Sequence, residues 1–118
     1  MMIAGIGSRK GVTPRDVRAA IETALEARGL AMTALSALAT GEIKRDEEAI
    51  FLAGRDLALP VIVVTDDALQ VAASGTISLP SVSEASALAA AGKDAKLLGP
   101  RTVLGPVTCA IALGGGAE

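Results

Sequence analysis

The stretch MIAGIGSRKGVTPRD, residues 2–16, carries in order the signals of a strand, a loop and the start of a helix. The apolar run Ile3–Ile6 predicts a short buried strand, because it stops abruptly at a glycine, a serine and two cations. Thr13 is a favourable N-cap residue, and Pro14 suits the first helical position. The stretch therefore predicts the first half of a βαβ unit, with a cationic loop after its strand.

The same alternation continues along the chain. Apolar residues recur at helical spacing from Pro14 until Gly29, and Ser81-Val82-Ser83-Glu84 forms a capping box that predicts the start of a later helix. The run Val61–Val64 is the clearest strand because its residues are β-branched. The predicted helices cover roughly residues 14–28, 47–57 with Asp46 as N-cap, 66–71 and 82–92. The predicted strands cover residues 3–6, 35–39, 61–64, 97–104 as one strand interrupted at Gly99-Pro100, and 107–113.

Strands that alternate with helices indicate right-handed βαβ units and a mostly parallel sheet. The closing strands lie close together in the sequence, so we expect an antiparallel strand near the C-terminus. We therefore predict an α/β fold: a single three-layer domain over residues 1–113, followed by a flexible glycine-rich tail over residues 114–118. A chain of 118 residues can build one such core but not two.

The composition argues against several classes of function. The formal net charge is −2 and Phe51 is the single aromatic residue, so we expect no nucleic-acid partner. No apolar run approaches the roughly 18 residues of a membrane helix, and the first residues lack the pattern of a signal peptide, so we expect no membrane association. The single cysteine, Cys109, fits a reducing compartment, and we expect a cytoplasmic protein.

Histidine is absent from the chain. Its absence removes the usual general base near neutral pH and the commonest transition-metal ligand, so we expect neither a metal nor a cofactor. Any catalysis would rest on carboxylates, lysine, hydroxyls or backbone amides. Cys109 lies in an apolar run without a visible activator and is expected to be an inert core residue.

Polar loops follow the first three predicted strands, where ligands bind in open α/β sheets. The first loop, Gly7–Gly11, fits an anion site and equally a tight turn with solvated cations. It matches neither G-x-G-x-x-G nor the Walker pattern, because Lys10 stands where each requires glycine. The second loop, Thr40–Glu47, fits ligand contacts or simply the charged start of a helix. The candidate ligand-binding residues are Gly7, Ser8, Arg9, Lys10, Gly11, Thr40, Glu42, Lys44, Thr65 and Ser81.

Several motifs, taken in order, resemble one known family. They are Gly5-Ile6-Gly7-Ser8-Arg9-Lys10-Gly11, Leu38-Ala39-Thr40 with Lys44 and Glu47, Leu59-Pro60, Pro80-Ser81-Val82-Ser83-Glu84-Ala85 and Val107-Thr108-Cys109-Ala110-Ile111-Ala112. Their order and spacing resemble the CobE / CbiG C-terminal family of cobalamin biosynthesis over nearly the whole chain. In that family a Thr-x-x-x-Lys pattern, here Thr40 and Lys44, is followed by an acid, here Glu47. Gly41-Glu42 departs from the more usual apolar or small polar residue followed by an acid.

The resemblance implies a role in building the corrin ring, and three hypotheses stay open. The first is a binding module for a precorrin or hydrogenobyrinic-acid-type tetrapyrrole of the aerobic pathway. The second is a hydrolase or lyase that opens a precorrin lactone with loss of acetaldehyde, as in CbiG, with Glu47 or Glu42 as base and Lys44 as electrostatic stabiliser. The third is an accessory subunit of another cobalamin biosynthesis enzyme. The lack of histidine favours the binding module, and the carboxylates around such a ring suit Arg9, Lys10 and Lys44.

Overall fold

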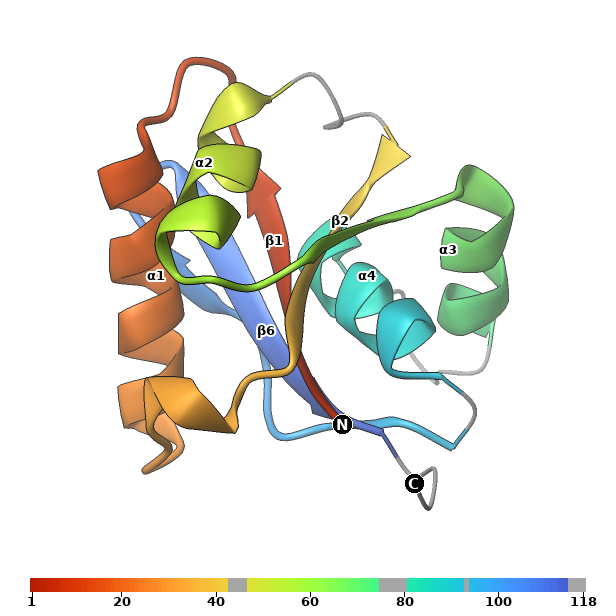
Figure 1. The fold of residues 1–118 in the computed structure, drawn as a ribbon. Coiled ribbons are helices and arrows are strands. Elements are labelled where there is room, and N and C mark those ends of the chain that lie inside the picture. The colour runs from red at the N-terminus through yellow and green to blue at the C-terminus, as the bar shows by residue number, and fades with distance from the viewer. Residues whose placement is uncertain (43–46, 75–80, 93, 115–118) are drawn as a thin grey trace.

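A computed structural model describes residues 1–42, 47–74, 81–92 and 94–114 (Figure 1). Strands and helices alternate over the first two-thirds of the chain, and strands alone follow the last helix. The elements are β1 (Met2–Ser8), α1 (Pro14–Ala27), a short 3₁₀ helix η1 (Met32–Ala34), β2 (Ala37–Gly41), α2 (Glu48–Asp56), β3 (Val61–Val64), α3 (Asp66–Ser74), α4 (Val82–Ala91), β4 (Lys96–Leu97), β5 (Thr102–Leu104) and β6 (Val107–Leu113).

The strands form one mixed sheet of six strands in the order β3-β2-β1-β6-β4, with β5 also paired to β6. β1 pairs with β2 and β2 with β3 in parallel, as expected for βαβ units. β6 runs antiparallel to β1, β4 and β5. The predicted α/β fold with an antiparallel C-terminal strand is confirmed, and the antiparallel part extends to β4, β5 and β6.

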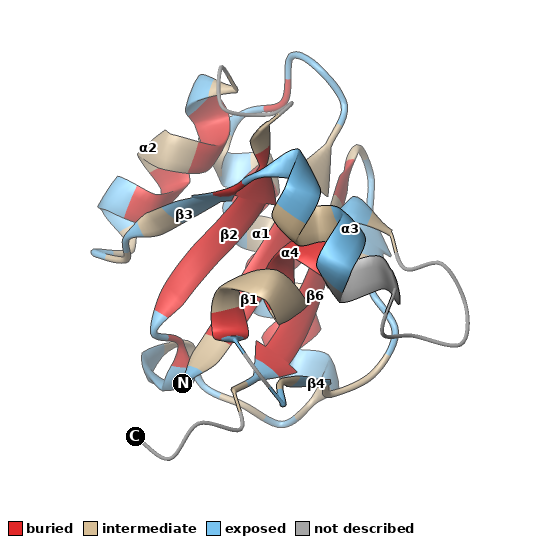
Figure 2. Ribbon diagram, turned by 90° about the vertical axis from the view of Figure 1, so that its right-hand side faces the viewer, coloured by how far each residue is buried: buried red, intermediate tan, exposed pale blue. Residues whose placement is uncertain are grey.

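Helices cover both faces of the sheet, which makes the three layers (Figure 1). α1 and α2 pack on one face over a core that includes Ile6, Ile21 and Ile50, each fully buried. α4 lies on the other face, with α3 beside it, over a core made largely of alanine around Ile3 and Ala87. Figure 2 shows the central strands β1, β2 and β6 as the most buried part of the molecule.

Two predicted strands differ from the observed ones. Residues 35–39 were expected in the second strand, but β2 spans Ala37–Gly41, because Leu35 closes η1 and strand pairing begins at Ala37 opposite Ile3. The prediction of one interrupted strand over residues 97–104 is wrong. The structure has two strands, β4 and β5, which pair with different parts of β6. In the segment between them, Arg28 Nη2 donates to the carbonyl oxygen of Pro100 (3.2 Å).

The helix boundaries follow the capping signals closely. The expected N-cap Thr13 and the capping box of Ser81 and Glu84 are both confirmed. The N-cap of α2 is Glu47, so the prediction of Asp46 is wrong, and Asp46 itself lies outside the described residues. α3 continues three residues past the predicted end at residue 71, to residue 74. Residues 115–118 of the predicted tail also lie outside the described residues. Within the described part of the chain, no helix is long and apolar enough to cross a membrane.

Candidate functional site

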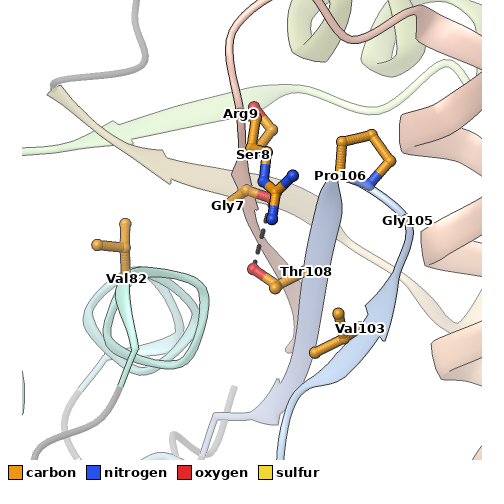
Figure 3. A pocket seen from close by; sticks show the side chains of 8 residues that line it. All are labelled: Gly7, Ser8, Arg9, Val82, Val103, Gly105, Pro106 and Thr108. Atoms are coloured by element: carbon orange, nitrogen blue, oxygen red, sulfur yellow. Dashed lines mark hydrogen bonds between the residues drawn. The ribbon is translucent and has the colours of Figure 1, made fainter.

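A pocket of about 310 Å³ opens where β1 ends, beside the start of α4. Three elements wall it: the end of β1, the first turn of α4 and the hairpin that joins β5 to β6 (Figure 3). We call it the β1–α4 pocket. Its lining residues are Gly7, Ser8, Arg9, Val82, Val103, Gly105, Pro106 and Thr108.

Glycines in β1 let the start of α4 approach the sheet. A Cβ atom at Gly5 would collide with the carbonyl oxygen of Ser83 and lie 2.7 Å from the amide nitrogen of Ala87. A Cβ at Gly7 would lie 2.8 Å from the Thr108 hydroxyl. Side chains at these positions would therefore push α4 and β6 away from β1 or fill the pocket.

Backbone hydrogen bonds fix the wall made by β1 and the hairpin. Gly7 and Thr108 face each other in the antiparallel register of β1 and β6, and the Thr108 hydroxyl donates weakly to the carbonyl oxygen of Gly7 (3.4 Å). One residue beyond β1, the amide of Arg9 donates to the carbonyl oxygen of Pro106 (3.0 Å). The cationic residue therefore starts from a fixed backbone position at the rim of the pocket.

Two polar groups at the pocket lack partners within the described part of the chain. The Arg9 side chain is exposed and takes part in none of the hydrogen bonds or ion pairs of these residues, and it reaches over Gly7 towards Thr108 (Figure 3). The Ser8 hydroxyl is buried and has no hydrogen-bond partner there. Buried polar groups are normally satisfied, so the Ser8 hydroxyl is an exception to the rule. The exposed Arg9 guanidinium is available to a ligand with acceptor oxygens.

Two apolar side chains at the rim of the pocket are open to solvent. Val82 at the start of α4 is 42% exposed, and Val103 in β5 is 61% exposed. They lie on opposite sides of the pocket (Figure 3). The site thus combines a guanidinium that has no partner among the described residues with two exposed apolar side chains, an arrangement suited to an anionic ligand that also has a broad apolar part.

The Glu84 carboxylate joins two walls of the pocket. It accepts hydrogen bonds from the amide (2.9 Å) and hydroxyl (3.0 Å) of Ser81 at the start of α4, and from the amide of Arg101 (3.1 Å) just before β5. Partial burial acts to raise the pKa of Glu84, but the bonds from Ser81 and Arg101 and the charge of Arg101 outweigh it and hold the pKa below its usual value.

The structure brings together part of the predicted site. Gly7, Ser8 and Arg9 line the pocket. Ser81 precedes Val82 at the same wall, but its hydroxyl is engaged in capping α4. The predicted residues Lys10 and Gly11 are exposed in the turn after β1, where Gly11 has φ +82°.

The predicted residues of the second and third loops have other surroundings. Thr40 is fully buried, and its hydroxyl donates to the carbonyl oxygen of Ile6 (3.0 Å). Glu42 accepts from the amide of Asp66 (2.9 Å), and the Thr65 hydroxyl accepts from the amide of Ala68 (3.1 Å) at the start of α3. Glu47 is the half-buried N-cap of α2, and Lys44 lies outside the described residues.

Sequence reasoning missed the half of the pocket that comes from the C-terminal part of the chain. The missed residues are Val82, Val103, Gly105, Pro106 and Thr108. A local signal existed in Gly105-Pro106, because a glycine-proline pair between two apolar runs is typical of a turn. If that turn had been recognised as a hairpin that pairs with the first strand, the wall formed by β5 and β6 could have been predicted.

The acidic residues and the one cysteine do not form a metal centre in the described residues, where no group of three or more metal-ligating side chains converges. Cys109 is fully buried in β6, and burial raises the pKa of its thiol to about 12. The thiol is therefore protonated at neutral pH, as expected of an inert core residue.

Comparison with known proteins places the chain in one family. The family model "Cobalamin synthesis G C-terminus" matches residues 2–112. Cobalamin biosynthesis protein ChiG from Agrobacterium tumefaciens is 37% identical, with a TM-score of 0.88, and the match covers 98% of this chain and all (100%) of that chain. CobE, a protein from the cobalamin biosynthetic pathway, is 33% identical over 95% of this chain and 89% of its own, with a TM-score of 0.83.

A homologue of cobalamin biosynthesis protein G from Sulfolobus solfataricus shares the fold at 24% identity and a TM-score of 0.76, and the match covers 96% of this chain but 36% of that longer chain. The comparison with curated proteins finds no match. The family model and the two structures above 30% identity agree with the resemblance carried by the sequence motifs. The chain therefore belongs to the CbiG C-terminal / CobE family of cobalamin biosynthesis proteins.

Proposed function

We propose that this protein binds a tetrapyrrole acid of the precorrin or hydrogenobyrinic-acid type, and that it does so at the β1–α4 pocket. The observation that carries the proposal is the Arg9 guanidinium, which has no partner among the described residues and lies in the same pocket as the exposed valines Val82 and Val103. Such tetrapyrroles are broad apolar rings edged with carboxylates. A guanidinium can hold a carboxylate through two parallel hydrogen bonds, while the valines contact the ring.

The pocket lining favours binding over catalysis. None of the described residues that line it is a carboxylate, and the chain has no histidine, so the lining offers no ordinary group for proton transfer. Glu47, the base of the hydrolase hypothesis, belongs to the start of α2, on the other face of the sheet from α4. We therefore propose a binding role and treat lactone opening as the competing outcome.

Absorbance titration with hydrogenobyrinic acid tests the proposal. We expect saturable binding by the wild-type protein and a roughly tenfold or greater loss in Arg9→Gln, since a hydrogen bond between charged groups contributes about 1.5–3 kcal/mol. Arg15→Gln is the matched control, because Arg15 is an exposed arginine on α1 outside the pocket. Equal affinity in the wild type and Arg9→Gln would contradict the assignment of the pocket.

The same preparation decides between binding and turnover. Incubation with a lactone-containing precorrin, followed by an assay for acetaldehyde, should give bound pigment without product. If the wild-type protein released acetaldehyde and Glu47→Gln did not, the hydrolase hypothesis would replace the binding hypothesis. Lys44→Ala belongs in the same series, because the family pattern implies a role for Lys44 in holding the ligand.

A further inference from the structure

We infer that the tetrapyrrole is held by one edge: a single carboxylate arm enters the β1–α4 pocket, and the rest of the ring stays in solvent. This inference rests on the proposed function and adds the manner of binding. Its first support is size. The pocket holds about 310 Å³, whereas drug-sized molecules occupy pockets of roughly 300–1,000 Å³, and a tetrapyrrole acid is larger than most drugs.

The arrangement of polar and apolar groups gives the second support. Arg9 and Thr108 supply polar side-chain groups to the lining, while Val82 on α4 and Val103 on β5 border it on opposite sides. An acetate or propionate arm that enters between the valines would meet the guanidinium. The ring edge that carries this arm would then lie at the rim, where Val82 and Val103 are exposed.

The third support is the exposure of those two valines at the pocket. Apolar side chains that project this far, 42% for Val82 and 61% for Val103, gain from contact with a ring edge that the pocket cannot enclose. A site that enclosed the ring would need apolar walls on more than two sides. The described lining offers three apolar side chains, Val82, Val103 and Pro106, and its remaining members are glycine or polar.

Edge binding leaves the opposite edge of the ring accessible. The carboxylates on the far edge of the ring keep their water, and that edge stays free for a second protein. A protein that recognises tetrapyrrole carboxylates could therefore take hold of the ring before this one releases it.

Accessibility of the bound ring tests the inference directly. Hydrogenobyrinic acid contains no cobalt and serves as its own fluorophore, and acrylamide is a neutral quencher that does not compete for Arg9. We expect the quenching constant of the bound ring to stay within about twofold of the free value. A drop of tenfold or more would show an enclosed ring and overturn the inference, while leaving the proposed function intact. Absence of binding by the wild-type protein would overturn both.

Comparing protein variants with acid and amide forms of the ligand tests which residues hold the bound edge of the ring. Amidation of the peripheral carboxylates should weaken binding tenfold or more in the wild type and should cancel the effect of Arg9→Gln, because the guanidinium then has no carboxylate to hold. Val103→Ser should weaken binding severalfold, whereas Val63→Ser, an exposed valine on β3, should leave it unchanged. An Arg9→Gln effect of equal size for acid and amide would overturn the assignment of the arm to Arg9.

Discussion

At the scale of single residues, Gly5 decides how closely α4 can lie on the sheet. A methyl group there would meet the Ser83 carbonyl oxygen and the Ala87 amide, both backbone atoms that cannot rotate away. We expect Gly5→Ala to lower the free energy of unfolding by about 1–3 kcal/mol or more, the usual cost of overpacking. Urea denaturation measures the loss.

Gly7→Ala is the comparison for that variant, since the obstacle at Gly7 is the side-chain hydroxyl of Thr108. We expect a smaller loss of stability than in Gly5→Ala, together with a narrower pocket and weaker ligand binding. If Gly5→Ala were as stable as the wild type, the close packing of α4 on β1 would be contradicted.

Cys109 provides a residue-scale test of the core. Because burial raises the pKa of its thiol to about 12 from 9.0, the neutral thiol is favoured in the folded state. Its contribution to stability should be complete below about pH 9 and should fall as the pH rises from there towards 12. At pH 8 the native protein should react with Ellman's reagent only at the rate of unfolding, and 6 M urea should release full reactivity. Rapid labelling without denaturant would disprove this burial.

At the scale of elements, Glu84 holds the start of α4 to the segment before β5. Glu84→Gln should lower the free energy of unfolding at pH 7 by about 1–2 kcal/mol, because the amide cannot accept all three hydrogen bonds. The ion pair with Arg101 adds little, since its atoms are 3.9 Å apart and Arg101 is 46% exposed.

The pH dependence of that loss follows from the pKa of Glu84, which folding lowers from 4.5. The carboxylate contributes stability above pH 4.5, and this contribution disappears as the pH falls through the lower pKa of the folded state. The wild type and Glu84→Gln should therefore converge in acid. Glu22→Gln, an exposed acid on α1, should match the wild type throughout. A gap between wild type and Glu84→Gln that persisted below the folded-state pKa would exclude the carboxylate as its source.

The elements also show what local sequence signals could and could not predict. The caps at Thr13 and Ser81 act within one helical turn, and both helices start where the sequence predicted. Leu35 misled the strand prediction, because it is a core residue that ends η1 rather than joining β2. A buried residue is usually apolar whether it ends a helix or belongs to a strand, so the apolar character of Leu35 could not distinguish η1 from β2.

At the scale of the whole molecule, the pocket depends on contacts between distant parts of the chain. Gly7 and Thr108 are 101 residues apart, and only the antiparallel pairing of β1 with β6 brings them together. The end of β1 was predictable as one wall, because ligands collect at the carboxyl ends of parallel strands. The other walls were not, because strand pairing over such a separation leaves no local pattern.

A ligand held between distant segments should stabilise the entire fold. Hydrogenobyrinic acid at a hundred times its dissociation constant should raise the free energy of unfolding by about 2.7 kcal/mol, since the unfolded chain has no pocket. Arg9→Gln, compared at the same ligand concentration, should show a clearly smaller rise although its stability without ligand equals that of the wild type. An equal rise in both proteins would place the ligand elsewhere.

The first and last described residues, Met1 and Gly114, adjoin the two central strands β1 and β6. Met2 pairs with Leu113, and the amide of Gly114 donates to the carbonyl oxygen of Met1 (2.6 Å). A short linker could therefore join Gly114 to Met1, and the resulting circular chain could be opened at Gly29, which is exposed beyond α1. Such a circular permutant would make β6 and β1 consecutive in the chain and convert their long-range pairing into a local hairpin. It should therefore fold faster than the natural chain, while the pocket stays unchanged.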